Sequence, residues 1–159
     1  METLWVYHTR IDRCLRVIAI PAVAGLLLAL APPAVADPAD LRAEVDSARA
    51  ATSCPPFQNN PLIDQVAQQV LDSTNGYVDH ASHSQPIQDA LPLLKDNGYE
   101  ASKAVVLAGA STSEADAIRS VKLEGFRSIP DCTFTDAGYS TLQNADTDMV
   151  LTTVVLTGK

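Results

Sequence analysis

The sequence has few of the residues that usually carry catalysis or bind metals. Its 159 residues include three histidines and three cysteines. It contains no G-x-S-x-G nucleophile motif, no H-E-x-x-H zinc motif and no glycine-rich phosphate loop. Internal repeats and low-complexity tracts are also missing. These absences weaken the case for a serine hydrolase, a zinc peptidase or a nucleotide-binding enzyme.

Basic segments are scarce as well. The formal net charge is −8 at pH 7, and the only clustered basic residues are three arginines near the N-terminus. Proteins that bind nucleic acids or anionic membrane surfaces usually present a basic patch or run. An acidic chain without one is therefore not expected to bind either of them.

The first 36 residues have the organisation of a secretory signal. Three arginines between positions 10 and 16 precede the apolar stretch 17–30, and Ala34-Val35-Ala36 forms a small-x-small cleavage site. Three prolines interrupt this region, and the stretch is short for a membrane anchor. We predict a signal peptide at 1–36 and a single exported domain at 37–159, secreted or held in the cell envelope, without an integral membrane segment.

Two cysteines remain after removal of the signal. Cys14 lies within it, which leaves Cys54 and Cys132. Two cysteines in an exported domain most simply form one disulfide, although two free buried thiols are the alternative. Closing a loop of roughly 80 residues would stabilise the fold by about 4.5 kcal/mol in the chain-entropy model. Neither cysteine has a partner at the spacing of a zinc site.

The hydrophobic patterns predict four helices and three strands. Helices are expected at about 40–51, 61–75, 86–97 (kinked or split by Pro92) and from a Ser113 capping box to about 124. Asp40 is the expected cap of the first helix, and Asn60 that of the second. Strands are expected at 103–111, 134–142 and 149–157. This order predicts an α+β domain with a small antiparallel three-stranded sheet.

Several strings resemble, in order, segments of the CAP superfamily, whose members carry SCP domains. They are VDSARAATSCPPF, NNPLIDQVAQQVLDS, YVDH, LKDNGY and EADAIRSVKLEGFRSIPDCTFTDAGYS. The resemblance covers roughly residues 41–158 and is to the short, secreted branch of actinobacterial type. It implies a three-layer α/β/α sandwich.

The resemblance also implies a degenerate site. Metal-binding members use two histidines and two acids, and His80 matches the first histidine. The second histidine corresponds to Phe126, and the first acid corresponds to Ala104. For the second acid three residues remain open, namely Glu114, Asp116 and Glu124. At least two of the four groups are missing by this alignment.

Within the exported part, the stretch GYVDHASHSQP brings together an acid and two histidines, side chains that can bind a metal or transfer a proton. His80 and His83 are its only histidines, and Asp79 would be a third ligand or would orient an imidazole. A zinc site needs several converging ligands, and the flanking Gly76 and Pro86 indicate a loop. We therefore predict a remnant site without metal, cofactor or catalytic residue. Phe126 suits an apolar ligand or core packing.

The leading hypothesis is a secreted CAP-like domain that acts as a non-catalytic binding module. Its ligand would be a lipid, a cell-envelope component or a protein. The main alternative is an extracellular hydrolase with a reduced metal site, or with a serine such as Ser111 and a histidine base. A purely structural envelope protein is a third possibility.

Overall fold

The computed structural model describes residues 37–159, and the predicted signal peptide lies outside the described residues. The elements are, in chain order, α1 (Pro38–Ala50), β1 (Gln58–Asn59), α2 (Pro61–Val78), α3 (Leu91–Asp96), β2 (Lys103–Ser111), α4 (Glu114–Glu124), β3 (Asp136–Asn144) and β4 (Met149–Gly158). No helix within this part of the chain is long and apolar enough to cross a membrane.

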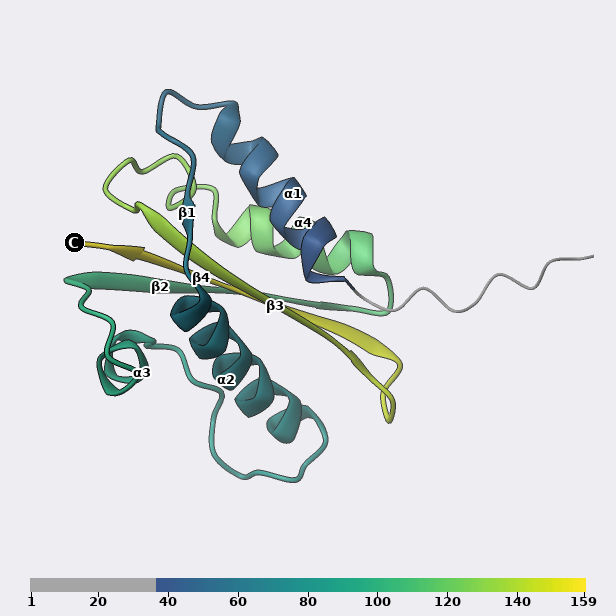
Figure 1. Cartoon of the computed structure of the whole chain (residues 1–159). Helices are drawn as coiled ribbons and strands as arrows, with labels where there is room; N and C mark the ends of the chain where they lie inside the picture. Colours follow the sequence, from purple (N-terminus) through teal and green to yellow (C-terminus); the bar gives the residue numbers. More distant parts are fainter. Residues whose placement is uncertain (1–36) are drawn as a thin grey trace, which may run out of the picture. The chain divides into compact units, whose positions relative to one another are not determined.

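The sheet has four strands in the order β1-β3-β4-β2, so the expectation of three strands was wrong (Figure 1). The missed strand is β1, a two-residue strand that pairs in parallel with the start of β3. It is too short for any periodicity to reveal it. The other pairs, β2 with β4 and β3 with β4, are antiparallel as expected.

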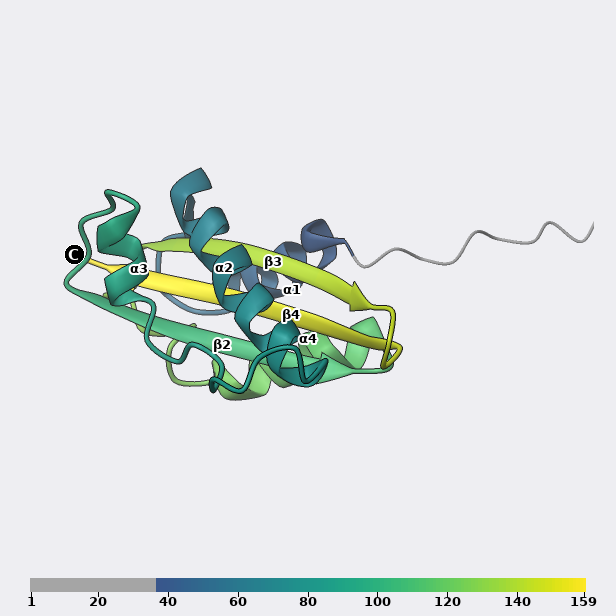
Figure 2. The same ribbon diagram turned by 90° about the horizontal axis from the view of Figure 1, so that it is seen from below.

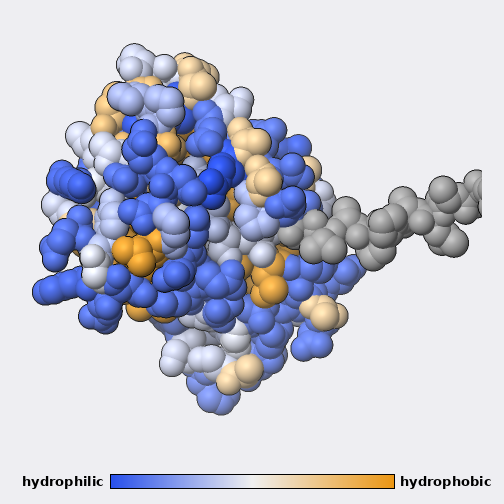
Figure 3. Space-filling view, viewed as in Figure 1, coloured by the Kyte–Doolittle hydropathy of each residue, from blue (hydrophilic) through white to orange (hydrophobic). Residues whose placement is uncertain are grey.

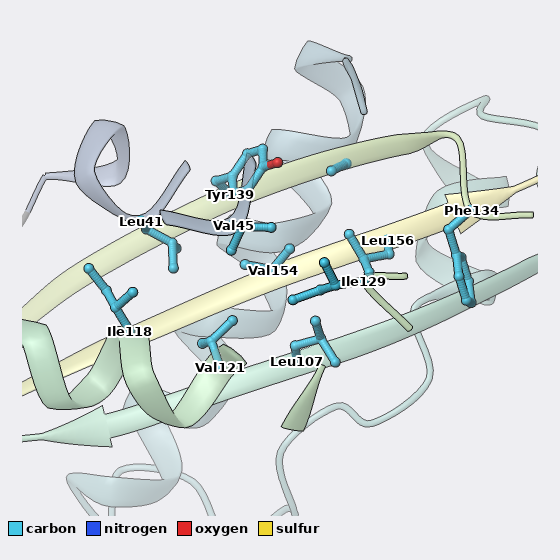
Figure 4. Close-up of a cluster of buried hydrophobic side chains, with 11 residues drawn as sticks. Leu41, Val45, Leu107, Ile118, Val121, Ile129, Phe134, Tyr139, Val154 and Leu156 are labelled. Atoms are coloured by element: carbon cyan, nitrogen blue, oxygen red, sulfur yellow. The ribbon is translucent and has the colours of Figure 1, made fainter. Parts of the chain in front are cut away.

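Helices lie on both faces of the sheet, which is the middle of three layers (Figures 1 and 2). Successive residues of the central strand β4 point to opposite faces. Val154 and Leu156 pack with Leu41 of α1 and Val121 of α4, as Figure 4 shows. Val155 instead packs with residues of α2 and α3. The domain therefore has two separate apolar clusters, one on each face.

Two glycines allow helices to lie directly on the sheet. A Cβ at Gly138 of β3 would come within 2.3 Å of the backbone carbon of Ile63 in α2. A Cβ at Gly109 of β2 would lie 2.1 Å from the backbone oxygen of Ala117 in α4. Any larger residue would push the helix away, so these positions set the depth of α2 and α4 on their respective faces.

The helix ends differ in part from those expected. The cap of α1 is Asp37 rather than Asp40, because Pro38 occupies the first turn and the Asp37 side chain accepts from the Ala39 N–H. Asn60 caps α2 as expected. That helix continues past Asn75-Gly76 to Val78, and the left-handed residue after it is His80, with φ 56°.

The third helix is much shorter than expected. It begins at Leu91, with Pro92 in its first turn, and residues 86–90 are not helical. Proline is tolerated at that position because the first N–H groups of a helix have no internal partner, so it starts the helix here rather than kinking it. Gly98, with φ 79°, follows the helix as expected.

The predicted disulfide between Cys54 and Cys132 is present. It joins the segment after α1 to the segment before β3. The same two segments are also held together by Arg49, which is only 1% exposed. Its guanidinium donates to the backbone oxygens of four residues: Pro55 (2.8 Å), Ile129 (2.6 Å), Asp131 (3.0 Å) and Phe134 (2.8 Å).

Candidate functional site

Both histidines of the predicted remnant site lie on the surface beyond the end of α2. His80 directly follows the helix cap, and His83 is in the irregular segment that leads to α3. Both side chains are exposed.

Asp79 is engaged in a different network. Its Oδ2 accepts from the Asn75 amide at 2.9 Å, and its Oδ1 accepts from the Asn144 amide at 2.6 Å. The Asn144 amide also donates to Asn75 Oδ1 at 2.7 Å, and Asn144 Oδ1 accepts from the backbone of the β3–β4 turn. Asp79 therefore fastens the end of α2 to the hairpin, and amides occupy both of its oxygens.

Phe126 lies apart from these groups. It follows α4, which packs on the face of the sheet opposite to α2 (Figures 1 and 2). Its side chain is 64% exposed, so it neither fills the core nor closes a cavity. Ala104, at the expected position of the first acid, packs against the α2 and α3 cluster. The structure does not bring His80 and Phe126 together.

The three candidates for the second acid are each engaged with another group. Glu114 accepts from the backbone N–H of Asp37 at 3.0 Å. Asp116 forms an ion pair with Arg119 at 2.9 Å. Glu124 accepts from the backbone N–H of Ala108, on the outer edge of β2, at 2.6 Å. Across residues 37–159, no three histidine, cysteine, aspartate or glutamate side chains are placed to hold one metal ion.

Burial changes the ionisation of groups that the sequence did not single out. Burial raises the pKa of Tyr139, and Asp46, which accepts its hydroxyl hydrogen at 3.1 Å, raises it further. Burial lowers the pKa of Arg49, while the nearby Asp131 acts in the opposite direction. Both side chains pack inside the structure, where they link α1 to other segments. They are structural groups rather than parts of an open site.

A groove of about 450 Å³ lies between α1 and α4. It is lined by Asp40, Ala43, Glu44, Glu114, Ala115, Ile118, Arg119 and Lys122. Lys122 and Glu44 form an ion pair across it at 2.5 Å. The groove is thus lined mostly by charged side chains, together with Ala43, Ala115 and Ile118. Sequence analysis missed it because the two helices are about 70 residues apart, and no local pattern predicts that they are neighbours.

The surface next to this groove carries two exposed apolar side chains. Leu123 is 68% exposed and Phe126 is 64% exposed; Leu123 is in the last turn of α4, and Phe126 follows three positions later, just after the helix. Arg119 precedes Leu123 by one turn and also lines the groove, and the Arg127 guanidinium lies 5.1 Å from the Phe126 ring. We call these four residues, Arg119, Leu123, Phe126 and Arg127, the α4 patch.

The α4 patch differs from the rest of the surface. The face shown in Figure 3 is mostly hydrophilic, with small separate apolar areas. Among residues 37–159, the only other large apolar side chain that is exposed is Tyr77, at 47%, on α2. A helical pattern could have revealed the patch, since Leu123 interrupts the polar face of α4.

The sequence matches no protein-family model and none of the curated proteins. Solved structures share the fold. A cysteine-rich secretory protein of Staphylococcus aureus superposes with a TM-score of 0.58 at 12% identity, over 77% of this chain and 38% of that one. An outer surface protein of Borrelia burgdorferi gives 0.58 at 8% identity, over 76% of this chain and 91% of that one.

An extracellular SCP-domain protein of Bacillus anthracis gives a TM-score of 0.50 at 14% identity, over 76% of this chain and 40% of that one. The chain therefore spans about two fifths of the length of the staphylococcal and bacillar proteins that it resembles. At these identities the likeness shows the fold, which is that of SCP domains. It supports the resemblance to the CAP superfamily at that level.

Proposed function

We propose that this chain is an exported CAP-type domain, processed after Ala36, that works as a non-catalytic binding module. Three features support export: the order of charged, apolar and small residues at 1–36, the disulfide, and the extracellular or surface location named for the structural neighbours. We assign the chain to the short actinobacterial-type branch with a degenerate site.

The exposure of Leu123 and Phe126 carries the binding proposal. Covering two large apolar side chains at the surface of a small acidic domain with a partner would be favourable, because it removes apolar area from water. Aromatic and arginine side chains are also the commonest binding hot spots in protein interfaces. The partner we propose is a protein surface with an apolar pocket bordered by carboxylates, because Arg127 lies beside the Phe126 ring and, within residues 37–159, forms no ion pair.

The dispersal of the predicted site favours binding over hydrolysis. A nucleophile and its base, or a metal and its ligands, must lie within hydrogen-bonding or coordination distance of each other. His80 and His83 are exposed beyond α2, and both Asp79 oxygens accept hydrogen bonds from amides. Ser111, at the end of β2, has its hydroxyl oxygen accepting from the Ser113 N–H.

A capture experiment tests the proposal. The exported protein, immobilised through its C-terminus, is exposed to the extracellular fraction of its own host, and the retained partner is identified and titrated. We expect Leu123→Ser with Phe126→Ser to weaken binding of that partner at least tenfold. Tyr77→Ser, which removes the exposed aromatic side chain of α2, should leave binding unchanged.

Three results would contradict parts of the binding proposal. Equal binding by the wild type and the Leu123/Phe126 double variant would remove the α4 patch from consideration. An esterase or peptidase activity that disappears in His80→Ala would replace the binding proposal with the hydrolase alternative. Undiminished binding by Arg127→Glu at low salt would contradict the proposed carboxylates on the partner.

A further inference from the structure

Asp37 is fixed in the structure through both its backbone and its side chain. Its side chain caps α1 by accepting from the Ala39 N–H at 2.9 Å. Its own backbone nitrogen donates to Oε1 of Glu114, at the start of α4, at 3.0 Å. The capping residue of α1 is thereby tied to Glu114 of α4, which lies 77 positions further along the chain.

We propose that signal-peptide cleavage converts this hydrogen bond into an ion pair that belongs to the exported fold. The inference rests on the processing step of the proposed function. Hydrolysis of the Ala36–Asp37 bond adds one water: Ala36 leaves as a carboxylate, and the Asp37 nitrogen becomes an amine. Ordinary α-amino groups have a pKa of about 7.7–8.0, so at neutral pH this nitrogen takes up a proton and carries a positive charge.

The charges around the Asp37 nitrogen favour the ammonium form. On α4 the facing group is the Glu114 carboxylate, and on α1 the nearby groups are the side chains of Asp37 and Asp40. The cations of the groove are already matched, because Lys122 pairs with Glu44 and Arg119 pairs with Asp116. Within residues 37–159, neither Glu114 nor Asp40 forms an ion pair.

The macrodipoles of the two helices act in opposite directions. The positive end of α1 disfavours an ammonium at Asp37, while the same end of α4 favours the Glu114 carboxylate. Three carboxylates near one ammonium outweigh the partial charge at the start of α1. The pair is exposed, so its contribution is that of a surface ion pair.

The position of the cut is essential for this pair. Cleavage one residue later would remove the Asp37 cap of α1, and cleavage earlier would leave the Asp37 nitrogen in a neutral peptide bond. Only a cut after Ala36 places a positive charge on the nitrogen that contacts Glu114. Processing at that bond would therefore complete the contact between α1 and α4.

A thermal double-mutant cycle tests the inference. The full chain is expressed with its signal, and intact mass establishes where the exported form begins. The cycle compares this form with a variant that has one serine inserted between Ala36 and Asp37, each with and without Glu114→Gln. At neutral pH and low salt, Glu114→Gln should lower Tm by about 1–4 °C more in the chain that begins at Asp37.

Two controls separate charge from packing. Glu44→Gln removes an acidic groove residue whose ion pair is with Lys122 and does not involve the N-terminus. It should therefore lower Tm equally with and without the inserted serine. At pH 10 the α-amino group is deprotonated, so the extra effect of Glu114→Gln should disappear.

Equal effects of Glu114→Gln in the two chains at neutral pH, or an extra effect that persists at pH 10, would overturn the ion pair. An exported chain that begins at another residue would overturn it too. The capture experiment on the α4 patch uses other residues, so the two proposals can fail separately.

Discussion

Replacing Arg49 by methionine should destabilise the fold by about 3–5 kcal/mol, the usual result of breaking a buried charged interaction. Four backbone oxygens, from two segments of the chain, share this one guanidinium. Each hydrogen bond to a charged group contributes about 1.5–3 kcal/mol, and each buried oxygen left without a donor costs about 1–3 kcal/mol. Two effects offset part of this summed cost. The variant no longer buries a charged group, and water can enter the loops and hydrogen-bond to the freed oxygens.

Urea unfolding followed by far-UV circular dichroism measures this loss. The single tryptophan, Trp5, lies in the predicted signal peptide, so tryptophan fluorescence cannot report on the exported domain. With an m-value of about 2 kcal/mol/M, the Arg49→Met midpoint should fall by about 2 M. The matched control is Arg42→Met, also on α1, which removes a partly exposed ion pair with Asp64 at 3.6 Å and should cost at most about 1 kcal/mol.

Equal midpoints for the two arginine variants would refute the reasoning. Such a result would mean that the loops relax without cost when Arg49 is lost. The disulfide offers a second check, because Cys54 precedes Pro55 and Cys132 follows Asp131, two of the residues whose oxygens Arg49 binds. Groups that hold the same segments are expected to act non-additively. The cost of Arg49→Met should therefore differ between the oxidised and reduced proteins.

Two further predictions concern the disulfide and the histidines. Cys54→Ala and Cys132→Ala should each cost roughly 2–5 kcal/mol in the same urea assay, and two freely alkylatable thiols in the unreduced exported protein would contradict the bridge. The double change His80→Ala with His83→Ala should alter stability by less than about 1 kcal/mol, since both side chains are exposed. EDTA should leave Tm unchanged, whereas a structural metal would contribute to folding directly, and its removal would lower Tm sharply.

Local sequence signals predicted most of the elements because their causes are local. The Asn60 cap with proline after it marks the start of α2, and a short apolar run marks β2 with the observed bounds. The sequence-based predictions are wrong where tertiary contacts, rather than local sequence, determine the structure. α2 continues through Asn75-Gly76 because the Asn75 side chain bonds to Asp79 and Asn144 instead of ending the helix. β1 exists only because β3 lies beside it.

The candidate site was harder to predict because it depends on which elements are neighbours. The histidine pair was found from residue type, and the sequence left open whether it was exposed to solvent or at the edge of a cleft; both side chains are exposed. The α1–α4 groove requires two helices that are distant in the chain to pack side by side. Arg49 lies within the string VDSARAATSCPPF, but that string does not predict its four carbonyl partners, which lie between positions 55 and 134.

The placement of Phe126 predicts that a histidine at this position, where the resemblance to metal-binding CAP proteins implies one, would not create a metal site. Phe126 follows α4 on one face of the sheet, and His80 follows α2 on the other. An imidazole at position 126 would lie near Leu123 and Arg127, and Ala104 would still provide no carboxylate. A cation such as Arg127 beside a prospective ligand also disfavours binding of a metal ion. The same features, an aromatic ring and a guanidinium on an exposed helical turn, are suited to contact with another protein. In the proposed function, the binding surface of this SCP-type fold is therefore the exposed side of α4 and not the histidines after α2.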